Sequence, residues 1–252
     1  MSQHHTPSAN EETFISHLVE LRSRLVKAAA VVLVVFLALM PFAGEIYDVL
    51  ARPMMSALPE GSKMIATGVI TPFLVPVKVT MLVAFLVALP WVLYQAWAFI
   101  APGLYAHEKR LIAPLVISSS VLFLVGVAFC YFFVFGMVFK FINNFAPKSI
   151  AVAPDIEAYL SFVMTMFIAF GLTFEVPVVV VVLVRMGIVS VEKLKAVRPY
   201  VIVGAFIIAA VVTPPDIVSQ LLLAVPLCLL YELGLLIAPM FARMTRAPEE
   251  AA

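Results

Sequence analysis

Long apolar stretches separated by charged residues run along most of this 252-residue chain. Within each stretch the apolar residues are continuous, as in 28–40, rather than alternating with polar ones. Continuous runs of about 20 apolar residues are typical of transmembrane helices, whereas strands of a membrane barrel alternate. The sequence therefore predicts six transmembrane helices, within 25–43, 74–98, 111–139, 158–184, 199–215 and 217–231, with apolar residues continuing after Glu232 to about 242.

The last two of these stretches are short for a bilayer crossing. A helix needs about 20 residues to span roughly 30 Å of hydrocarbon. The string Thr-Pro-Pro-Asp at 213–216 predicts a turn between them, because proline cannot continue a helix. Two arrangements fit: a pair of short spans, or one re-entrant hairpin that does not cross. We favour two short spans, since tilt and local thinning of the bilayer absorb the mismatch.

Composition agrees with a membrane protein. Hydrophobic residues make up 64% of the chain and charged residues 12%, with a mean hydropathy of +1.12, whereas a soluble domain is about half apolar and about a quarter charged. The net charge of +1 gives no indication of nucleic-acid binding. Cys130 and Cys228 stand alone in apolar stretches, so we expect two small buried residues rather than a disulfide or a metal site.

The distribution of Lys and Arg predicts the orientation. The side of the membrane that carries more of them belongs in the cytoplasm, and an even number of spans places both termini there. We expect a cytoplasmic N-terminus over 1–24, a single six-helix membrane domain over 25–242 and a cytoplasmic tail over 243–252. The first span is expected to be retained rather than cleaved as a signal peptide. The cytoplasmic set is Arg22, Arg24, Lys27, Lys109, Arg110, Arg185, Lys193, Lys195, Arg198, Arg243 and Arg246, against Arg52, Lys63, Lys140 and Lys148 outside.

Motifs for catalysis or nucleotide binding are not found in the sequence. It holds no Walker loop, no G-x-G-x-x-G, no H-E-x-x-H, no C-x-x-C and no G-x-S-x-G. We therefore expect a protein that is not an enzyme and that binds no cofactor or metal.

Several unusual strings follow one another along residues 13–240. They include FISHLVELR at 14–22, YQAWAFIAPGLYAHE at 94–108, FGLTFEVP at 170–177 and TPPDIVSQ at 213–220. Their order and content resemble the TatC family, the multi-spanning subunits of the twin-arginine protein translocase. The resemblance implies a signal-peptide receptor and core subunit that exports folded proteins across the bacterial cytoplasmic (inner) membrane, driven by the protonmotive force. It also implies single-span TatA and TatB subunits as partners, and other copies of this chain.

Four residues match the signal-peptide surface of that family: Glu20, Arg22, Phe99 and Glu108. The resemblance implies that Glu108 and Glu20 accept the guanidinium groups of paired arginines, that Arg22 orients Glu20, and that Phe99 packs the apolar residue that follows. A carboxylate suits a planar guanidinium, which binds it through two hydrogen bonds. Without the family, Glu108 is a solvated loop charge, Glu20 and Arg22 are interfacial anchors, and Phe99 belongs to an aromatic belt.

Glu175 lies in an otherwise uncharged stretch, where an ionised carboxylate costs about 2.5–3.5 kcal/mol to insert. Our hypothesis is a polar contact in a lipid-facing concavity that receives a partner's transmembrane helix or the passing substrate. The alternative is a structural hydrogen bond between helices. Thr213 and Gln220 add polar groups at the edge where the family docks TatB. Asp216 is expected to cap the sixth helix, and Pro53 to end a short amphipathic helix near 45–50.

Prolines inside the predicted spans indicate a kinked arrangement. Pro53, Pro90, Pro177 and Pro226 would curve their helices, and with the family resemblance we expect a cup-like, all-α integral membrane protein. Short, proline-broken spans and Glu175 would also fit a proton-coupled small-molecule transporter. Against that alternative, the sequence shows no internal repeat and is small for a transporter.

Overall fold

The computed structural model describes residues 9–59, 61–100, 112–145, 147, 153–213 and 216–243. These residues contain no strand, and one isolated bridge pairs Ile65 with Asp155, so the prediction of an all-α protein is confirmed. The helices are α1 (Ala9–Leu39), α2 (Ala43–Met55), α3 (Thr71–Ile100), α4 (Ile112–Phe129), α5 (Phe135–Phe145), α6 (Ile156–Arg185), α7 (Val191–Ala196), α8 (Arg198–Val212) and α9 (Ile217–Arg243). A short 3-10 turn, η1 (Met40–Phe42), joins α1 to α2, and a π-helical segment, η4 (Cys130–Val134), joins α4 to α5.

All six predicted apolar stretches form helices. Five helical segments of the described chain are long and apolar enough to cross a membrane, and α8 is a shorter apolar helix. α8 has 15 residues, and at 1.5 Å per residue it is about 22 Å long, which is less than a bilayer core of about 30 Å. The prediction of a short fifth span is therefore correct. The five longer segments are Ser16–Met55, Thr71–Ile100, Ile112–Phe145, Ile156–Arg185 and Ile217–Met240.

The last helix is longer than predicted. α9 has 27 residues, so the prediction that the sixth span is also short, and interrupted at Glu232, is wrong. The Glu232 carboxylate accepts a 2.6 Å hydrogen bond from Nη2 of Arg198 on α8. A paired charge is far less costly in an apolar environment than an isolated one. The helix therefore continues through Glu232 instead of ending there.

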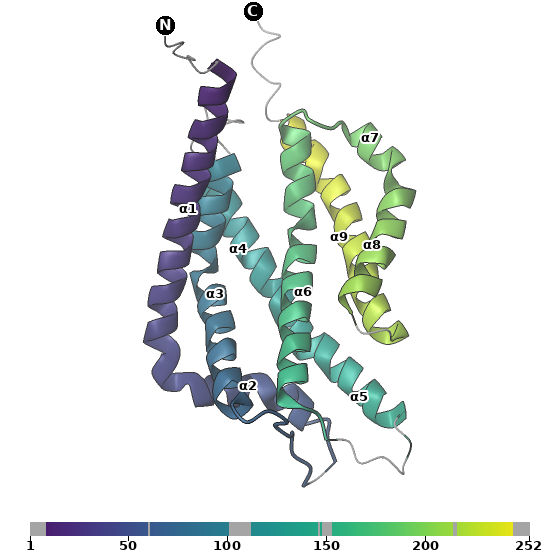
Figure 1. Cartoon of the computed structure of the whole chain (residues 1–252). Coiled ribbons are helices and arrows are strands. Elements are labelled where there is room, and N and C mark those ends of the chain that lie inside the picture. The colour runs from purple at the N-terminus through teal and green to yellow at the C-terminus, as the bar shows by residue number, and fades with distance from the viewer. Residues whose placement is uncertain are drawn as a thin grey trace, which may run out of the picture.

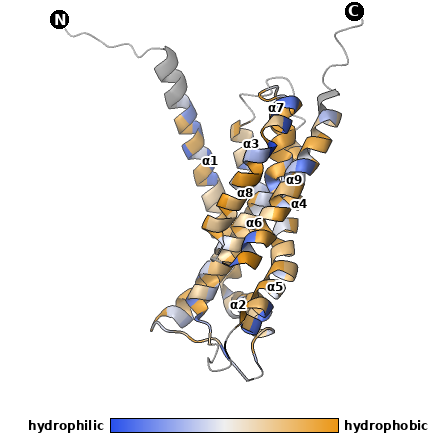
Figure 2. Cartoon of the chain, turned by 90° about the vertical axis from the view of Figure 1, so that its right-hand side faces the viewer, coloured by the Kyte–Doolittle hydropathy of each residue, from blue (hydrophilic) through white to orange (hydrophobic). Residues whose placement is uncertain are grey.

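The helices run between two distinct ends of the molecule. The start of α1, the end of α9 and the short α7 lie at one end, here called the terminal end (Figure 1). α2 and the end of α5 lie at the opposite end, here called the loop end (Figure 1). Apolar residues cover most of the helices between the two ends (Figure 2). This arrangement agrees with an even number of crossings; the side of the membrane on which each end lies stays a prediction.

Several helices contain prolines. Pro53, Pro90, Pro177 and Pro226 lie inside α2, α3, α6 and α9, at the positions where kinks were predicted. The third span contains a further irregularity that was not predicted, the π-helical segment η4. This segment contains no proline, and an inserted π turn leaves no clear signature in the sequence. The cup-like shape of the whole stays a prediction.

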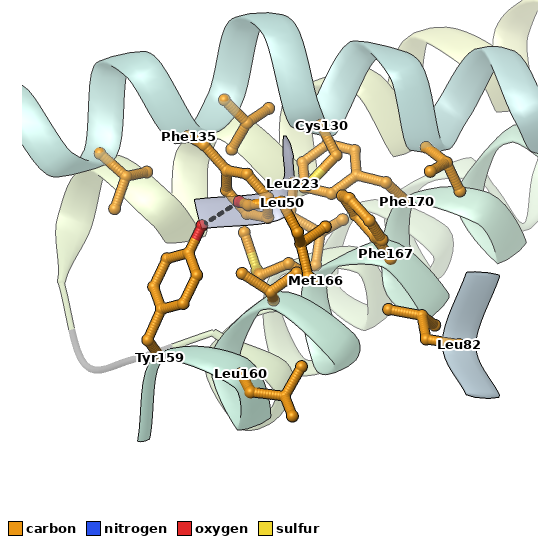
Figure 3. Close-up of a cluster of buried hydrophobic side chains, with 14 of the residues drawn as sticks. Leu50, Leu82, Cys130, Phe135, Tyr159, Leu160, Met166, Phe167, Phe170 and Leu223 are labelled. Atoms are coloured by element: carbon orange, nitrogen blue, oxygen red, sulfur yellow. Dashed lines mark hydrogen bonds between the residues drawn. The ribbon is translucent and has the colours of Figure 1, made fainter. Parts of the chain in front are cut away.

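A hydrophobic core fills the space between α3, α4, α5 and α6. Phe135, Met166 and Phe170 are fully buried within it (Figure 3). α4 and α6 approach each other closely here, because a Cβ added at Gly126 would lie only 2.6 Å from the carbonyl oxygen of Phe170. Glycine at this position thus fixes the crossing of the two helices, and Glu175 follows little more than one turn later on α6.

Two tyrosine hydroxyls hold α2 at the loop end. Tyr131 donates to the carbonyl of Val49 at 2.6 Å, and Tyr159 donates to the carbonyl of Leu50 at 2.7 Å (Figure 3 shows the second bond). Pro53 explains the first bond: it has no N–H, so the carbonyl four residues earlier, that of Val49, lacks its helical donor. α2 continues past Pro53. The predicted short helix is present, but the prediction that it ends at Pro53 is wrong, because Tyr131 supplies the missing hydrogen bond.

Asp155 joins the loop after α2 to the start of α6. Its Oδ1 accepts hydrogen bonds from the amides of Glu157 and Ala158 at 2.9 and 3.1 Å, which caps α6. Its Oδ2 accepts from the hydroxyl and the amide of Thr67 at 2.8 and 3.1 Å. The Thr67 hydroxyl, followed by the Ala158 amide, lowers the pKa of Asp155 below its ordinary value, because these donors stabilise the ionised carboxylate.

Candidate functional site

The start of α1 packs beside the end of α3 at the terminal end of the molecule (Figure 1). The rings of His17 and Phe99 stack with their centroids 4.3 Å apart and an angle of 23° between the planes. Glu20 lies three residues after His17, and residues three apart are neighbours on a helix surface. The structure therefore brings Glu20 and Phe99, two of the four predicted signal-peptide residues, to one surface. His17 was not predicted, although it lies in the string at 14–22.

Glu20 forms an ion pair within α1. Arg24 donates from Nε and Nη2 to Oε1 of Glu20 at 2.9 and 2.6 Å. The arginine that orients Glu20 is thus Arg24 rather than the predicted Arg22. The reason is geometric, because residues two apart in a helix point to different sides whereas residues four apart are neighbours. That spacing is the signal in the sequence that would have found the pair.

Glu108, the fourth predicted signal-peptide residue, lies outside the described residues. α3 ends at Ile100 and α4 begins at Ile112, so Glu108 belongs to the connection between the second and third spans, as the hydropathy pattern predicts. Its role as an acceptor of arginine stays a prediction.

Glu175 is buried inside the membrane-spanning part of α6, with 8% of its surface exposed. Its carboxylate is hydrogen-bonded to the hydroxyl of Ser119 on α4. Trp97 on α3 donates from Nε1 to the same hydroxyl oxygen at 3.0 Å. Because a hydroxyl has a single hydrogen, Ser119 accepts from Trp97 and donates to Glu175. A polar chain therefore connects α3, α4 and α6 in the middle of an apolar bundle.

The carboxylate of Glu175 also keeps one oxygen available. Within the described part of the chain no donor lies within hydrogen-bond distance of Oε1, although this atom is buried. Buried polar atoms usually have a partner, and an unsatisfied one costs about 1–3 kcal/mol. The hydrogen bond to Ser119 agrees with the alternative, a structural bond between helices. The oxygen Oε1 is left for the predicted contact with a partner, which stays a prediction. Ser119 was not predicted, and the run of three serines at 118–120 was the available signal.

Thr213 and Gln220 lie at the turn between α8 and α9. The Thr213 hydroxyl donates to the carbonyl of Ala209 at 2.8 Å, and Nε2 of Gln220 donates to the carbonyl of Phe206 at 3.3 Å. Both bonds stay within the hairpin, whereas the partner of Glu175 is Ser119 on α4. The structure therefore divides the predicted intramembrane polar site into two places, one in the bundle and one on the hairpin.

Asp216 has the structural role that was predicted for it. Its Oδ1 accepts a 2.7 Å hydrogen bond from the amide of Ser219, and its carbonyl accepts one from the amide of Gln220 at 3.2 Å. These contacts cap the first turn of α9. The short α8 and the longer α9 are therefore joined by a turn with a defined helix start.

Comparison with known proteins places the chain in one family. Residues 16–226 match the family model described as Sec-independent protein translocase protein (TatC). The chain is 49% identical over 239 residues to the Sec-independent protein translocase protein TatC of Escherichia coli (strain K12), which covers 95% of this chain and 93% of that relative. It is 52% identical over 238 residues to the protein of the same name from Halothiobacillus neapolitanus. That alignment covers 94% of this chain but 65% of the relative, which is longer.

A solved structure gives the same result for the fold. The crystal structure described as Twin Arginine Translocase Receptor TatC superposes on this chain with a TM-score of 0.78 at 37% sequence identity. The superposition covers 90% of this chain and 100% of the solved one. The match over most of the chain, in sequence and in structure, shows that this protein belongs to the TatC family of Sec-independent protein translocase subunits.

Proposed function

We propose that this chain is the twin-arginine signal-peptide receptor and core subunit of a translocase that exports folded proteins across the bacterial cytoplasmic membrane, driven by the protonmotive force. The relatives are named as protein translocases and the solved structure as a receptor. The observation that carries the proposal is the stacking of His17 on Phe99, which supports a surface with a carboxylate beside an aromatic ring. The role is binding and transport rather than catalysis, and family membership favours it over a small-molecule transporter.

The proposed binding mode exchanges one guanidinium for another. In the described structure the guanidinium of Arg24 is hydrogen-bonded to the carboxylate of Glu20. An arginine of the signal peptide would replace it there, and the second arginine of the pair would bind Glu108. Each charge-assisted hydrogen bond of this kind contributes about 1.5–3 kcal/mol. The ring of Phe99 would then pack against the apolar residue that follows the arginines.

The proposed orientation places the terminal end in the cytoplasm, where the signal peptides are made. Most Lys and Arg residues belong to that side of the predicted topology. Single-span TatA and TatB subunits and further copies of this chain are the proposed partners. A donor on a partner helix, or on the passing substrate, would bind the available oxygen of Glu175. The hairpin that carries Thr213 and Gln220 is the proposed edge for TatB.

Photocrosslinking tests the receptor role. A photoreactive residue at Phe99 of the full chain should crosslink to a precursor that carries paired arginines, and the crosslink should be lost when both arginines become lysines. Phe145, an exposed ring at the loop end, is the matched control and should give no crosslink to the signal peptide. A Phe99 crosslink that is unchanged with two lysines would contradict the proposal.

Replacement of Glu175 tests the intramembrane site. Glu175→Ala should reduce both export of a folded reporter and crosslinking to a partner's transmembrane helix, because the acceptor is removed. Ser119→Ala is the matched control, since it breaks the bond to α4 but leaves the carboxylate. If export and partner crosslinking of Glu175→Ala stay at wild-type levels, this part of the proposal is wrong.

A further inference from the structure

The N-terminal parts of α3 and α6 line an open groove of about 370 Å³ near the loop end of the molecule (Figure 1). Its charged residues are Lys78 on α3 and Glu157 on α6, and Nζ of Lys78 lies 2.8 Å from Oε1 of Glu157. The other described residues of the lining all belong to α6: Leu160, Ser161, Met164, Thr165 and Ile168. The groove therefore carries one neutral pair of charges beside an uncharged wall.

Polar groups come first along this face of α6, and apolar groups follow. Glu157 is the second residue of the helix, and Ser161 lies one turn later, about 6 Å farther along the axis. Ser161 is exposed, and its carbonyl accepts a hydrogen bond from the hydroxyl of Thr165 at 2.9 Å. Because the Thr165 hydroxyl is bonded to its own helix, the wall beyond Ser161 offers mainly carbon atoms.

The apolar part of the groove continues along α6 toward the terminal end. A second hollow of about 410 Å³ shares Thr165 and Ile168 with the first, and Leu172 on α6 and Ile208 on α8 also line it. α6 has 30 residues and is about 45 Å long, so it extends beyond a hydrocarbon core of about 30 Å. Its first turn then lies at the level of the lipid headgroups, and the two hollows follow the helix into the hydrocarbon.

The pair of Lys78 with Glu157 can bind further charged groups. An ammonium has three N–H donors and a carboxylate has two oxygens, and the bond between them uses one donor and one oxygen. The two side chains are 46% and 53% exposed. A negative group can therefore bind Lys78 while a positive group binds Glu157, and the pair itself stays intact.

We infer that this groove binds a phospholipid with an ethanolamine headgroup, whose phosphate binds Lys78 and whose ammonium binds Glu157. The four charges then alternate around a closed ring. The Ser161 hydroxyl donates to an ester carbonyl, and an acyl chain lies against Ile168 and Leu172. Charge complementarity selects the headgroup, because the carboxylate of Glu157 repels a purely anionic one and a choline ammonium has no N–H to donate.

Native mass spectrometry of the full chain in detergent tests this site. The probes are phosphatidylethanolamine, phosphatidylcholine and phosphatidylglycerol with the same acyl chains, added at equal concentration. The wild-type chain should retain phosphatidylethanolamine at least about threefold over either of the others, the effect of one exposed charge contact. If the wild-type chain retains phosphatidylcholine as well as phosphatidylethanolamine, the inference is wrong, and this comparison needs no variant.

Substitution of either charge should change lipid retention in its own way. Glu157→Gln leaves Lys78 without a carboxylate beside it, so phosphatidylglycerol should become the preferred lipid. Lys78→Gln should lower retention of all three lipids at least about threefold, because all three share the phosphate. Glu232→Gln is the matched control. It breaks a pair with Arg198 that also joins two helices, with side chains 43% and 42% exposed, and it should keep the preference for phosphatidylethanolamine over phosphatidylcholine.

Filling the apolar part of the groove separates the acyl chain from the headgroup. Ile168→Trp should lower retention of all three lipids without changing their order. Gel filtration and thermal unfolding identify which variants are folded. If folded Glu157→Gln or folded Lys78→Gln retains all three lipids like wild type, the pair only joins α3 to α6 and the inference is overturned. Release of a single-span partner by folded Ile168→Trp, with lipid retention unchanged, would also overturn it, because the groove would then hold a helix.

Discussion

The loop end and the first helix, α1, use their polar side chains in different ways. At the loop end, Tyr131, Tyr159 and Asp155 bond to segments far away in the sequence. At the terminal end, α1 packs mainly on α3, and Ala28 is the one buried side chain among residues 16–39. Hydrogen bonds between distant segments therefore hold the loop end, whereas α1 is lightly packed.

This difference separates structural from exchangeable contacts. The ion pair of Arg24 with Glu20 is partly exposed, with 23% and 37% of the two side chains accessible, and such pairs contribute about 0–1 kcal/mol. A carboxylate held so weakly can change partner. The bond from Tyr131 to Val49, in contrast, satisfies a carbonyl that Pro53 leaves without a helical donor. We expect substitutions near the start of α1 to alter binding, and substitutions at the loop end to alter stability.

The largest effect is expected at Glu20. Glu20→Gln keeps the shape of the side chain but removes the charge that pairs with a guanidinium. Affinity for a twin-arginine signal peptide should fall at least about tenfold, since a hydrogen bond to a charged group contributes about 1.5–3 kcal/mol. Titration of a fluorescent signal peptide onto the purified chain measures this affinity. The unfolding temperature should stay close to that of wild type, and a large drop in it would place Glu20 among the structural residues instead.

The next effect tests the loop end. Tyr131→Phe should lower the free energy of unfolding by about 1–2 kcal/mol, because the carbonyl of Val49 loses its donor. Pro53→Ala restores a helical N–H four residues after Val49, so it should reduce the cost of Tyr131→Phe. Denaturant unfolding in detergent micelles of the two single variants and the double variant measures the coupling free energy between Tyr131 and Pro53.

Tyr159→Phe is the matched control for that cycle. Its acceptor, the carbonyl of Leu50, is four residues before Met54, which has a backbone N–H. Pro53→Ala should therefore leave the cost of Tyr159→Phe unchanged. An equal rescue of both tyrosine variants would show that Pro53 acts on α2 as a whole rather than on one carbonyl.

A smaller effect is expected at Arg24. Arg24→Gln frees the carboxylate of Glu20, so a twin-arginine peptide should bind about two- to fivefold more tightly, the range set by an exposed ion pair. Arg22→Gln is the matched control, since Arg22 points to a different side of α1. The same peptide titration measures both. Weaker binding in Arg24→Gln would mean that Arg24 holds Glu20 in its binding geometry.

Much of the fold could be predicted because helices that contact lipid need long continuous stretches of apolar residues, which are visible in the sequence. The positions of all six apolar helices and the short α8 followed from it. The length of α9 did not, because Glu232 was taken as a break and its partner Arg198 lies 34 residues away. The π-helical segment of the third span was also missed, because it contains neither proline nor glycine.

The candidate site was predictable to a smaller extent. Glu175 stands out as a lone charge in an apolar stretch, so its burial follows from the sequence. The bond to Ser119 depends on how α4 crosses α6 at Gly126, and no local pattern encodes that crossing. The pair of Glu20 with Arg24 is different, because its spacing of four residues was readable in advance. Contacts within a helix are therefore recoverable from the sequence, and contacts between helices mostly are not.

The smallest effect is a pH dependence at the loop end. Hydrogen bonds, chiefly from the Thr67 hydroxyl, lower the pKa of Asp155 in the folded chain. Between this lowered pKa and the ordinary value of about 3.9 the unfolded chain binds more protons, so Asp155 stabilises the fold above about pH 4 and this contribution is lost as the pH falls through the folded pKa. Unfolding temperatures of wild type and Asp155→Asn should therefore differ at neutral pH and converge in acid. Thr67→Val should weaken this pH dependence, because it removes the principal donor, and a constant difference between wild type and Asp155→Asn at all pH values would show that the charge of Asp155 does not matter.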